Sequence, residues 1–278
     1  MAGVLLAVCA AVVWGAGDFF GGKASQRAHP VAVTVVSQLA CLPLLGLALL
    51  LFPGTAPAAS DLAWGLAAGV TGFLGIVLLY RGLSSGAMTV VAPITAVTAA
   101  ALPLGVGIVI DRSPGPVALL GAVLAVVAIA LVSTGPRAQW RTVSRRLLGI
   151  ALGSGAMFGL FFVLLAQARS GSGMWTLVAV RAGSLALGFV IAGLTRTSLR
   201  LPAGTLRWAV PAGIGDIAAN AFYLAAAQYG PLSIVAPVAA LYPATTVLLA
   251  VAVERERVRP VQVVGLGLAG CALVMIAA

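Results

Sequence analysis

Three polar side chains lie at helical spacing within one apolar stretch of the sequence. Asp216, Asn220 and Tyr223 are four and three residues apart, so a helix places them on one face. A carboxylate, an amide and a phenol on one face can line a pathway for a polar solute, with Asp216 as a proton carrier or a fixed counter-ion. The alternative is a structural polar group whose hydrogen bonds are satisfied by a neighbouring helix.

A single arginine, Arg181, also lies deep in an apolar stretch. An ionisable side chain at such a depth costs about 2.5–3.5 kcal/mol on insertion, so it requires a carboxylate or a water-filled cavity. Asp216 is the partner that we expect for it. Such an ion pair can belong to a solute pathway or be purely structural.

Other polar and aromatic groups are weaker candidates for a solute cavity. Tyr242 is followed by two threonines, and Thr98 occupies the equivalent place nearer the N-terminus. Aromatic and hydroxyl groups suit an amphipathic organic ligand, with core packing as the alternative. Asp18 either lines the inner mouth of a cavity or pairs with Lys23. Two further cavity candidates are Trp14 and Gln38.

Motifs for enzymatic chemistry are incomplete. Gly17–Lys23 has the spacing of a phosphate-binding loop, but Ala24 replaces the Ser or Thr that would hold magnesium. The one histidine, His29, cannot alone provide a zinc dyad or a Ser-His pair. The three cysteines lie in apolar runs and resemble small hydrophobic residues. We therefore expect no enzymatic activity, no metal and no cofactor.

The composition indicates which solvent surrounds the elements that carry these residues. Of 278 residues, 62% are hydrophobic and 8% are charged, whereas a soluble domain carries roughly 25% charged residues. So few charges cannot cover the surface of a water-soluble protein of this size. The sequence excludes an ordinary soluble enzyme and predicts an all-α integral membrane protein.

Ten apolar stretches match the thickness of a bilayer core, which takes about 20 residues per helix. Glycines at four-residue spacing, such as Gly65 and Gly69, predict close helix packing. Prolines inside the stretches free backbone carbonyls, and Pro93, Pro237 and Pro243 are hinge or broken-helix candidates. The predicted spans cover residues 3–22, 31–52, 62–80, 87–110, 116–134, 147–168, 174–194, 207–228, 232–253 and 260–277.

The two halves of the chain align at a shift of 144 residues. Ten of the 32 positions from Gly86 match those from Gly230, and Pro93 lies over Pro237. A repeat of five spans is odd in number, so the second copy enters the membrane from the opposite side. We expect ten transmembrane helices as two inverted five-helix repeats, in residues 1–135 and 146–278, joined by a basic loop over 136–145.

Lys and Arg residues predict an orientation. Thirteen of the 16 fall in alternate connections, on one membrane face. By the positive-inside rule this face is cytoplasmic, and both termini are extracytoplasmic. The net charge of +10 is then an orientation signal and a contact for anionic lipid head groups, so nucleic acid is not needed as a partner.

Taken together, these features resemble the ten-helix EamA type of the drug/metabolite transporter superfamily. The resemblance covers both repeats, Trp14-Gly15 in the first span, the two Val-Ala-Pro segments and Glu254 ahead of a glycine-rich last span. It implies a central cavity, with the fifth and tenth helices at the periphery. Members of the family are generally exporters of metabolites, amino acids or drugs.

The chain departs from this family at two places. The arginine usual in the second helix is replaced here by the Ser37-Gln38 region. Many relatives carry basic residues after the second helix and have cytoplasmic termini, whereas residues 53–61 contain none. The orientation therefore rests on this chain's charge bias against the family habit.

The resulting hypothesis is a secondary active transporter of the plasma membrane that exports a small organic solute by alternating access, coupled to protons or to exchange. A non-transporting membrane scaffold or sensor with the same bundle is the alternative. The oligomeric state stays open, and a monomer is compatible with the sequence.

Overall fold

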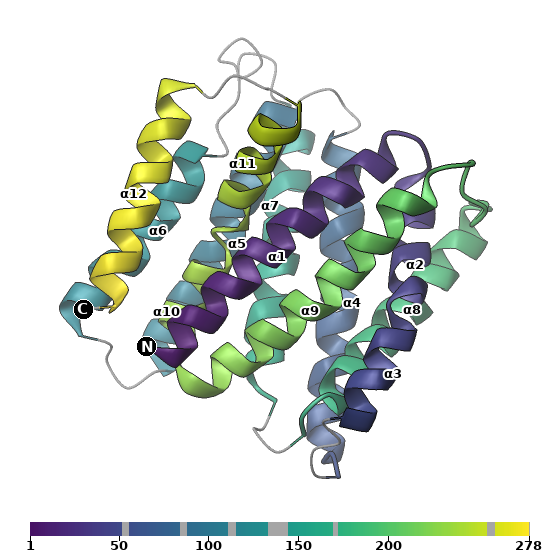
Figure 1. The fold of residues 1–278 in the computed structure, drawn as a ribbon, viewed down its shortest axis with the longest axis horizontal. Coiled ribbons are helices and arrows are strands. Elements are labelled where there is room, and N and C mark those ends of the chain that lie inside the picture. The colour runs from purple at the N-terminus through teal and green to yellow at the C-terminus, as the bar shows by residue number, and fades with distance from the viewer. Residues whose placement is uncertain are drawn as a thin grey trace.

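The computed structural model describes residues 1–51, 56–83, 88–110, 115–132, 144–168, 172–254 and 259–277 (Figure 1). Lipid offers no hydrogen-bond partner, so apolar segments satisfy their backbone groups internally as helices. Within these ranges the chain forms helices joined by turns and short connections. The helices are α1 (Ala2–Ser25), α2 (Pro30–Ala40), α3 (Leu42–Leu51), α4 (Ala59–Leu83), α5 (Met88–Ile110), α6 (Pro116–Val132), α7 (Arg145–Ala166), α8 (Trp175–Leu194), α9 (Leu206–Tyr229), α10 (Leu232–Ala239), α11 (Tyr242–Glu254) and α12 (Pro260–Ala277).

Six helical stretches in the described part of the chain have the length and hydropathy of a membrane span. Four shorter apolar helices accompany them, namely Ile94–Ile110, Pro116–Val132, Leu232–Thr246 and Pro260–Ile276. The all-helical, apolar architecture expected from the sequence is therefore observed. Ten spans remain a prediction for the whole chain.

Two of the predicted spans are each divided into two helices. The span predicted at 31–52 is interrupted at Cys41, between α2 and α3, and the span predicted at 232–253 is interrupted at Ala240 and Leu241, between α10 and α11. Both breaks come just before a proline, Pro43 or Pro243, which lacks an N–H and clashes with the carbonyl four residues earlier. By contrast, α5 continues without interruption through Pro93.

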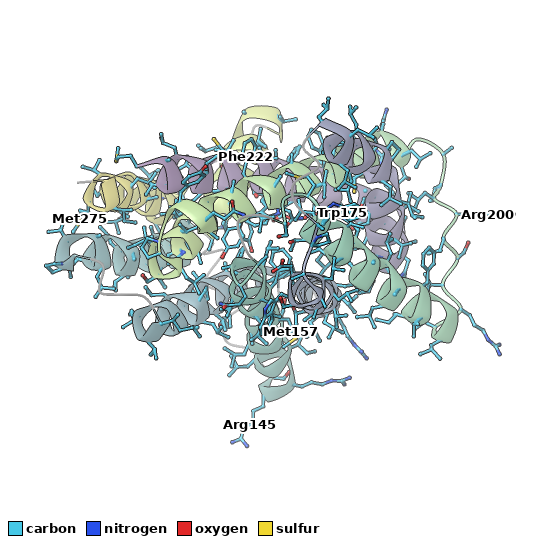
Figure 2. All side chains as sticks on the ribbon, turned by 90° about the horizontal axis from the view of Figure 1, so that it is seen from below. Arg145, Met157, Trp175, Arg200, Phe222 and Met275 are labelled. Atoms are coloured by element: carbon cyan, nitrogen blue, oxygen red, sulfur yellow. The ribbon has the colours of Figure 1, made fainter. Side chains whose placement is uncertain are left out.

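Small residues fill the interior of the bundle, and larger apolar residues cover its outside. Ala7, Ala10 and Ala219 are fully buried, whereas Leu50 is 81% exposed and Val274 is 70% exposed. In lipid an exposed leucine or valine is solvated, and small buried residues let helix backbones approach closely. Arg145 and Arg200 extend away from the bundle at its periphery (Figure 2).

Helices that are 144 residues apart in sequence have equivalent neighbours. α1 packs along α9, and α7, the equivalent of α1, packs along α4, the equivalent of α9. A Cβ at Gly3 would lie 3.1 Å from the nitrogen of Gly230, at the far end of α9. In the other pair a Cβ at Gly75 would lie 3.0 Å from the ring of Phe158. The packing thus follows the internal alignment of the sequence.

Two further crossings depend on a glycine at equivalent positions. Gly69 of α4 lies against the carbonyl of Val180 in α8, and Gly213 of α9 lies against the carbonyl of Ser37 in α2. Gly69 and Gly213 are 144 residues apart. At each crossing the backbones are so close that a β-carbon would collide with the opposite carbonyl oxygen. These contacts hold α8 and α2 against the centre of the bundle.

α6 and α12 pair with each other at one edge of the molecule (Figure 1). Gly265 of α12 lies against Val132, whose carbonyl also accepts a hydrogen bond from Gln262 Nε2 at 3.1 Å. The N and C marks both lie at the lower left of the view in Figure 1. Residues 136–143 of the predicted basic loop lie outside the described residues, as do Arg255 and Arg257.

Candidate functional site

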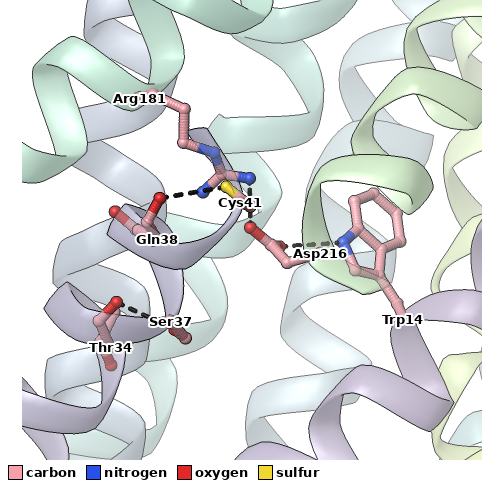
Figure 3. Close-up of polar contacts among 7 residues, drawn as sticks. All are labelled: Trp14, Thr34, Ser37, Gln38, Cys41, Arg181 and Asp216. Carbon is pink, nitrogen blue, oxygen red and sulfur yellow. Dashed lines mark hydrogen bonds and ion pairs between the residues drawn. The ribbon is translucent and has the colours of Figure 1, made fainter. Parts of the chain in front are cut away.

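An ion pair between α8 and α9 lies at the centre of the bundle. Arg181 Nη2 donates a hydrogen bond to Asp216 Oδ2, and the two groups form a salt bridge. Arg181 is 3% exposed, whereas the Asp216 side chain is 35% exposed because it borders a cavity. This is the partnership expected from the sequence, and it neutralises the buried guanidinium (Figure 3).

The second oxygen of Asp216 contacts α1. Trp14 Nε1 donates a hydrogen bond to Asp216 Oδ1 over 3.3 Å (Figure 3). The indole ring packs against Phe162, with centroids 5.4 Å apart, and against Tyr223, with centroids 5.7 Å apart. Asp216 is therefore held from two sides, by a charged donor on α8 and by a neutral donor on α1.

A cavity of about 120 Å³ surrounds this cluster. Its wall combines aromatic rings from α1, α4, α7 and α11 with charged and amide groups from α1, α2, α8 and α9. Such a wall can accommodate an amphipathic organic molecule. The lining residues are Trp14, Asp18, Gln38, Gly69, Gly72, Phe73, Ile76, Leu79, Phe158, Phe161, Phe162, Val180, Arg181, Ser184, Asp216, Asn220 and Tyr242.

A second chamber of about 60 Å³ shares Trp14, Asp18, Gln38, Ile76 and Asp216 with the main cavity. It extends along α1 and α2 and is lined in addition by Gly17, Gly21, Val33, Thr34, Ser37 and Ala212.

The second chamber extends toward one end of the bundle. Gly21 lies four residues before the end of α1, and Val33 lies three residues after the start of α2. Four residues correspond to about 6 Å of helix. The chamber therefore reaches to about one helical turn from the α1–α2 connection, where Lys23 and Arg27 are located.

Three polar atoms near the cavity are buried and have no hydrogen-bond partner among the described residues: Gln38 Oε1, Asn220 Oδ1 and Arg181 Nε. All three residues line the cavity and are less than 5% exposed. A buried polar atom without a partner is costly, so such atoms are usually satisfied by a bound molecule or water. The residues that line the cavity thus hold two acceptors and one donor, fully buried, that have no partner among the described residues.

Most of the predicted cavity residues meet at this site. Asp216, Arg181, Asn220, Tyr242, Asp18, Trp14 and Gln38 all line the main cavity. They come from five different helices, α1, α2, α8, α9 and α11.

Two predicted cavity residues lie elsewhere. Tyr223 is fully buried behind Trp14, where its hydroxyl donates to the carbonyl of Phe162 at 2.9 Å. Thr98 bonds to the carbonyl of Ile94 at 2.8 Å, and its Cβ lies against Gly155 of α7. Both residues contact neighbouring helices instead of the cavity.

The proline candidates differ in their surroundings. Pro237 lies inside α10, which ends two residues later, and Pro243 lies in the first turn of α11. Pro93 is within α5, and its side chain lies outside the described residues. Their role as hinges stays a prediction.

Several lining residues were not among the predicted ones. Phe73 of α4 and Phe158, Phe161 and Phe162 of α7 supply most of the aromatic wall. Their sequence context is that of a lipid-facing or packed helix, which gives no polar signal. For Phe158 the internal repeat provides a signal. The 144-residue shift aligns it with Trp14, which was a predicted cavity residue.

The sequence profile of the EamA-like transporter family matches residues 1–134 and 146–278. The chain belongs to the EamA-like transporter family. It is therefore an integral membrane transporter whose partner is a small-molecule solute, and membership in a transporter family favours a non-enzymatic role. No curated protein matches the chain.

The fold has relatives among solved structures. One, described only as "Crystal structure of protein", is 15% identical in sequence and superimposes with a TM-score of 0.73. The similarity covers 98% of this chain and 95% of the other. At this identity the likeness shows a shared fold alone. The transporter assignment rests on the family match.

Proposed function

We propose that this EamA-like protein is a secondary active transporter that exports a small organic metabolite or drug-like solute by alternating access, coupled to protons or to exchange. The observation that carries the proposal is the cavity around Arg181 and Asp216. An ion pair, three unpartnered polar atoms and a wall of aromatic rings converge there in a space large enough for a ligand.

The proposed architecture is ten transmembrane helices arranged as two inverted repeats, residues 1–135 and 146–278, around this cavity. The equivalent packing of α1 on α9 and of α7 on α4 supports it. In inverted-repeat transporters the substrate site lies between the repeats, and rocking of one half against the other exposes it to alternate sides. Here Trp14 of the first repeat contacts Asp216 of the second.

We further propose that this conformation is open to the cytoplasm and that both termini are extracytoplasmic, in the plasma membrane. The second chamber extends toward the face with Lys23 and Arg27, which the positive-inside rule assigns to the cytoplasm. Toward the opposite face, the ring cluster of Trp14, Phe162 and Tyr223 is the candidate closed gate.

The second candidate function is a non-transporting scaffold or sensor that uses the same bundle. A buried ion pair costs desolvation energy, and a scaffold would gain stability from apolar residues in its place. The cavity position of Arg181 and Asp216 therefore favours transport.

Flux measurements in proteoliposomes discriminate between these functions. Wild type and Asp216→Asn are reconstituted separately, and a panel of radiolabelled amino acids, amines and organic acids is tested for counterflow. Transport predicts saturable flux of at least one solute by wild type and a loss of that flux in Asp216→Asn. Absence of flux for every solute, with unchanged binding of a protein partner, would favour the scaffold.

A further inference from the structure

Among the described residues that line the cavity, the carboxylate of Asp18 has no hydrogen-bond or ion-pair partner. Asp18 lies one helical turn after Trp14 on α1 and borders both chambers. Its side chain is exposed, and it makes no hydrogen bond or ion pair with the residues that the structure describes. Lys23, the partner considered from the sequence, lies with its Nζ 6.0 Å from the ring centroid of Phe19.

The other charged groups of the cavity neutralise each other. Arg181 and Asp216 form an ion pair, and the second oxygen of Asp216 accepts from Trp14. In its ionised form, Asp18 therefore gives the two chambers a formal net charge of −1. A site with an uncompensated negative charge attracts cations and disfavours anions.

Aromatic rings strengthen this preference for a cation. Trp14 and Tyr242 line the main chamber together with four phenylalanines, and the face of each ring carries partial negative charge. Cations are attracted to such faces, and the same rings bury an apolar group. The second chamber is more polar, with Thr34, Ser37 and Gln38 in its wall.

The dimensions limit the size of the occupant. An engineered cavity of about 150 Å³ binds a benzene ring. The chambers here measure about 120 and 60 Å³ and share Asp18 at their junction. They therefore suit one ring or a short aliphatic group with an attached charged head.

We propose that the substrate class of this transporter is the small monovalent organic ammonium ion, with its charged nitrogen at Asp18 and its apolar group among the rings of the main chamber. The inference rests on the proposed transport function and specifies the solute. Asp18 is then the residue that selects charge, while the Arg181–Asp216 pair borders the bound molecule.

Equilibrium binding to the purified full chain in detergent tests this assignment. The probes are phenethylammonium, its neutral analogue phenethyl alcohol and the anion 3-phenylpropionate, with benzylammonium and butylammonium as smaller cations. Titration calorimetry and ligand-dependent thermal shift give the affinities. We expect at least one ammonium probe to bind at least tenfold more tightly than the alcohol, and the anion to bind most weakly.

Variants of Asp18 identify the residue responsible. Asp18→Asn is expected to lose at least tenfold in ammonium affinity while its affinity for the alcohol stays unchanged, and Asp18→Glu is expected to retain the preference for cations. Asp61→Asn, the same substitution in the first turn of α4 outside both chambers, should bind like wild type. If Asp18→Asn does not fold, the Asp18→Glu variant and the probe series still decide the outcome.

Several results would overturn the inference. These are absence of binding for every ammonium probe, binding of the alcohol or the anion as tight as that of the cations, or unchanged cation affinity in a folded Asp18→Asn variant. Flux of an anion or neutral solute in proteoliposomes without cation binding would refute the substrate class and leave the transporter intact. Cation binding without any flux would instead refute transport.

Discussion

Arg181 on α8 and Asp216 on α9 form an ion pair at the central cavity through Asp216 Oδ2, and Asp216 Oδ1 accepts a hydrogen bond from Trp14 on α1. One carboxylate thus connects a helix of the first half of the chain with two helices of the second half. A movement that separates α1 from α9 must break the hydrogen bond at Trp14. The ion pair can persist, because both of its partners belong to the second half.

Removal of one partner of the ion pair should destabilise the protein. Asp216→Asn leaves the buried guanidinium of Arg181 without its counter-ion, and we expect a loss of about 3 kcal/mol in unfolding free energy. The double variant Arg181→Gln with Asp216→Asn should recover most of this loss. Thermal unfolding in detergent, analysed as a double-mutant cycle, measures both effects. An Asp216→Asn variant as stable as wild type would contradict this account.

The hydrogen bond from Trp14 should matter for transport more than for stability. Trp14→Phe removes the Nε1 donor and keeps an aromatic ring beside Phe162 and Tyr223, so we expect a loss of only about 1 kcal/mol in unfolding free energy. The flux in proteoliposomes should fall at least tenfold. Trp208→Phe, outside the cavity lining, provides the matched control. Equal flux in the two variants would exclude a special role for Trp14.

The glycines at the two equivalent crossings should not tolerate a β-carbon. Gly69→Ala and Gly213→Ala would each drive a methyl group into a backbone carbonyl, at Val180 and Ser37 respectively. We expect losses of about 1–3 kcal/mol in unfolding free energy from the resulting shifts. Gly193→Ala is the control, since no described residue beyond its own stretch of helix lies within 4 Å of its added β-carbon. It should be neutral or stabilising by up to about 1 kcal/mol. Similar unfolding temperatures for all three would refute the close approach.

Tyr223 should affect stability without affecting solute affinity. Tyr223→Phe removes the hydrogen bond to the carbonyl of Phe162 at 2.9 Å, which we expect to cost about 1 kcal/mol of unfolding free energy. Since Tyr223 does not line the cavity, the dissociation constant of a bound solute should stay within twofold of wild type. Asn220→Ala, one turn away in the cavity wall, should weaken binding instead. A weaker solute affinity in Tyr223→Phe would instead show that Tyr223 contributes to the binding site.

The sequence was sufficient to predict the charged centre of the site. Arg181 and Asp216 are costly in an apolar helix, so each requires a partner, and few candidates exist in a chain with so little charge. The helical spacing of Asp216 and Asn220 likewise places both on the cavity side. Tyr223, at the next position of the same pattern, points to a neighbouring helix because the rotation of α9 is set by packing against α1 and α7.

The apolar wall could not be predicted in the same way. Phe73, Phe161 and Phe162 line the cavity, yet a phenylalanine that faces lipid, a neighbouring helix or a cavity has the same sequence signature. The sequence named Pro93, Pro237 and Pro243 alike as hinge or broken-helix candidates, because a proline can produce a kink or a full interruption. Pro43 and Pro243 follow interruptions, whereas Pro93 lies in a continuous α5. Local sequence does not distinguish these outcomes, which depend on the neighbouring helices.

The proposed transport requires access to the central cavity from alternate sides. Ile76 borders both chambers and is half-buried, so Ile76→Cys in a protein with Cys9, Cys41 and Cys271 replaced by Ser or Ala provides a single thiol in the pathway. Its reaction with a membrane-impermeant thiol reagent is measured from each side in oriented proteoliposomes, with and without a gradient of a transported solute. Alternating access predicts reaction from both sides, with the faster side exchanged when the gradient is reversed. Reaction from one side only, under every gradient, would contradict it.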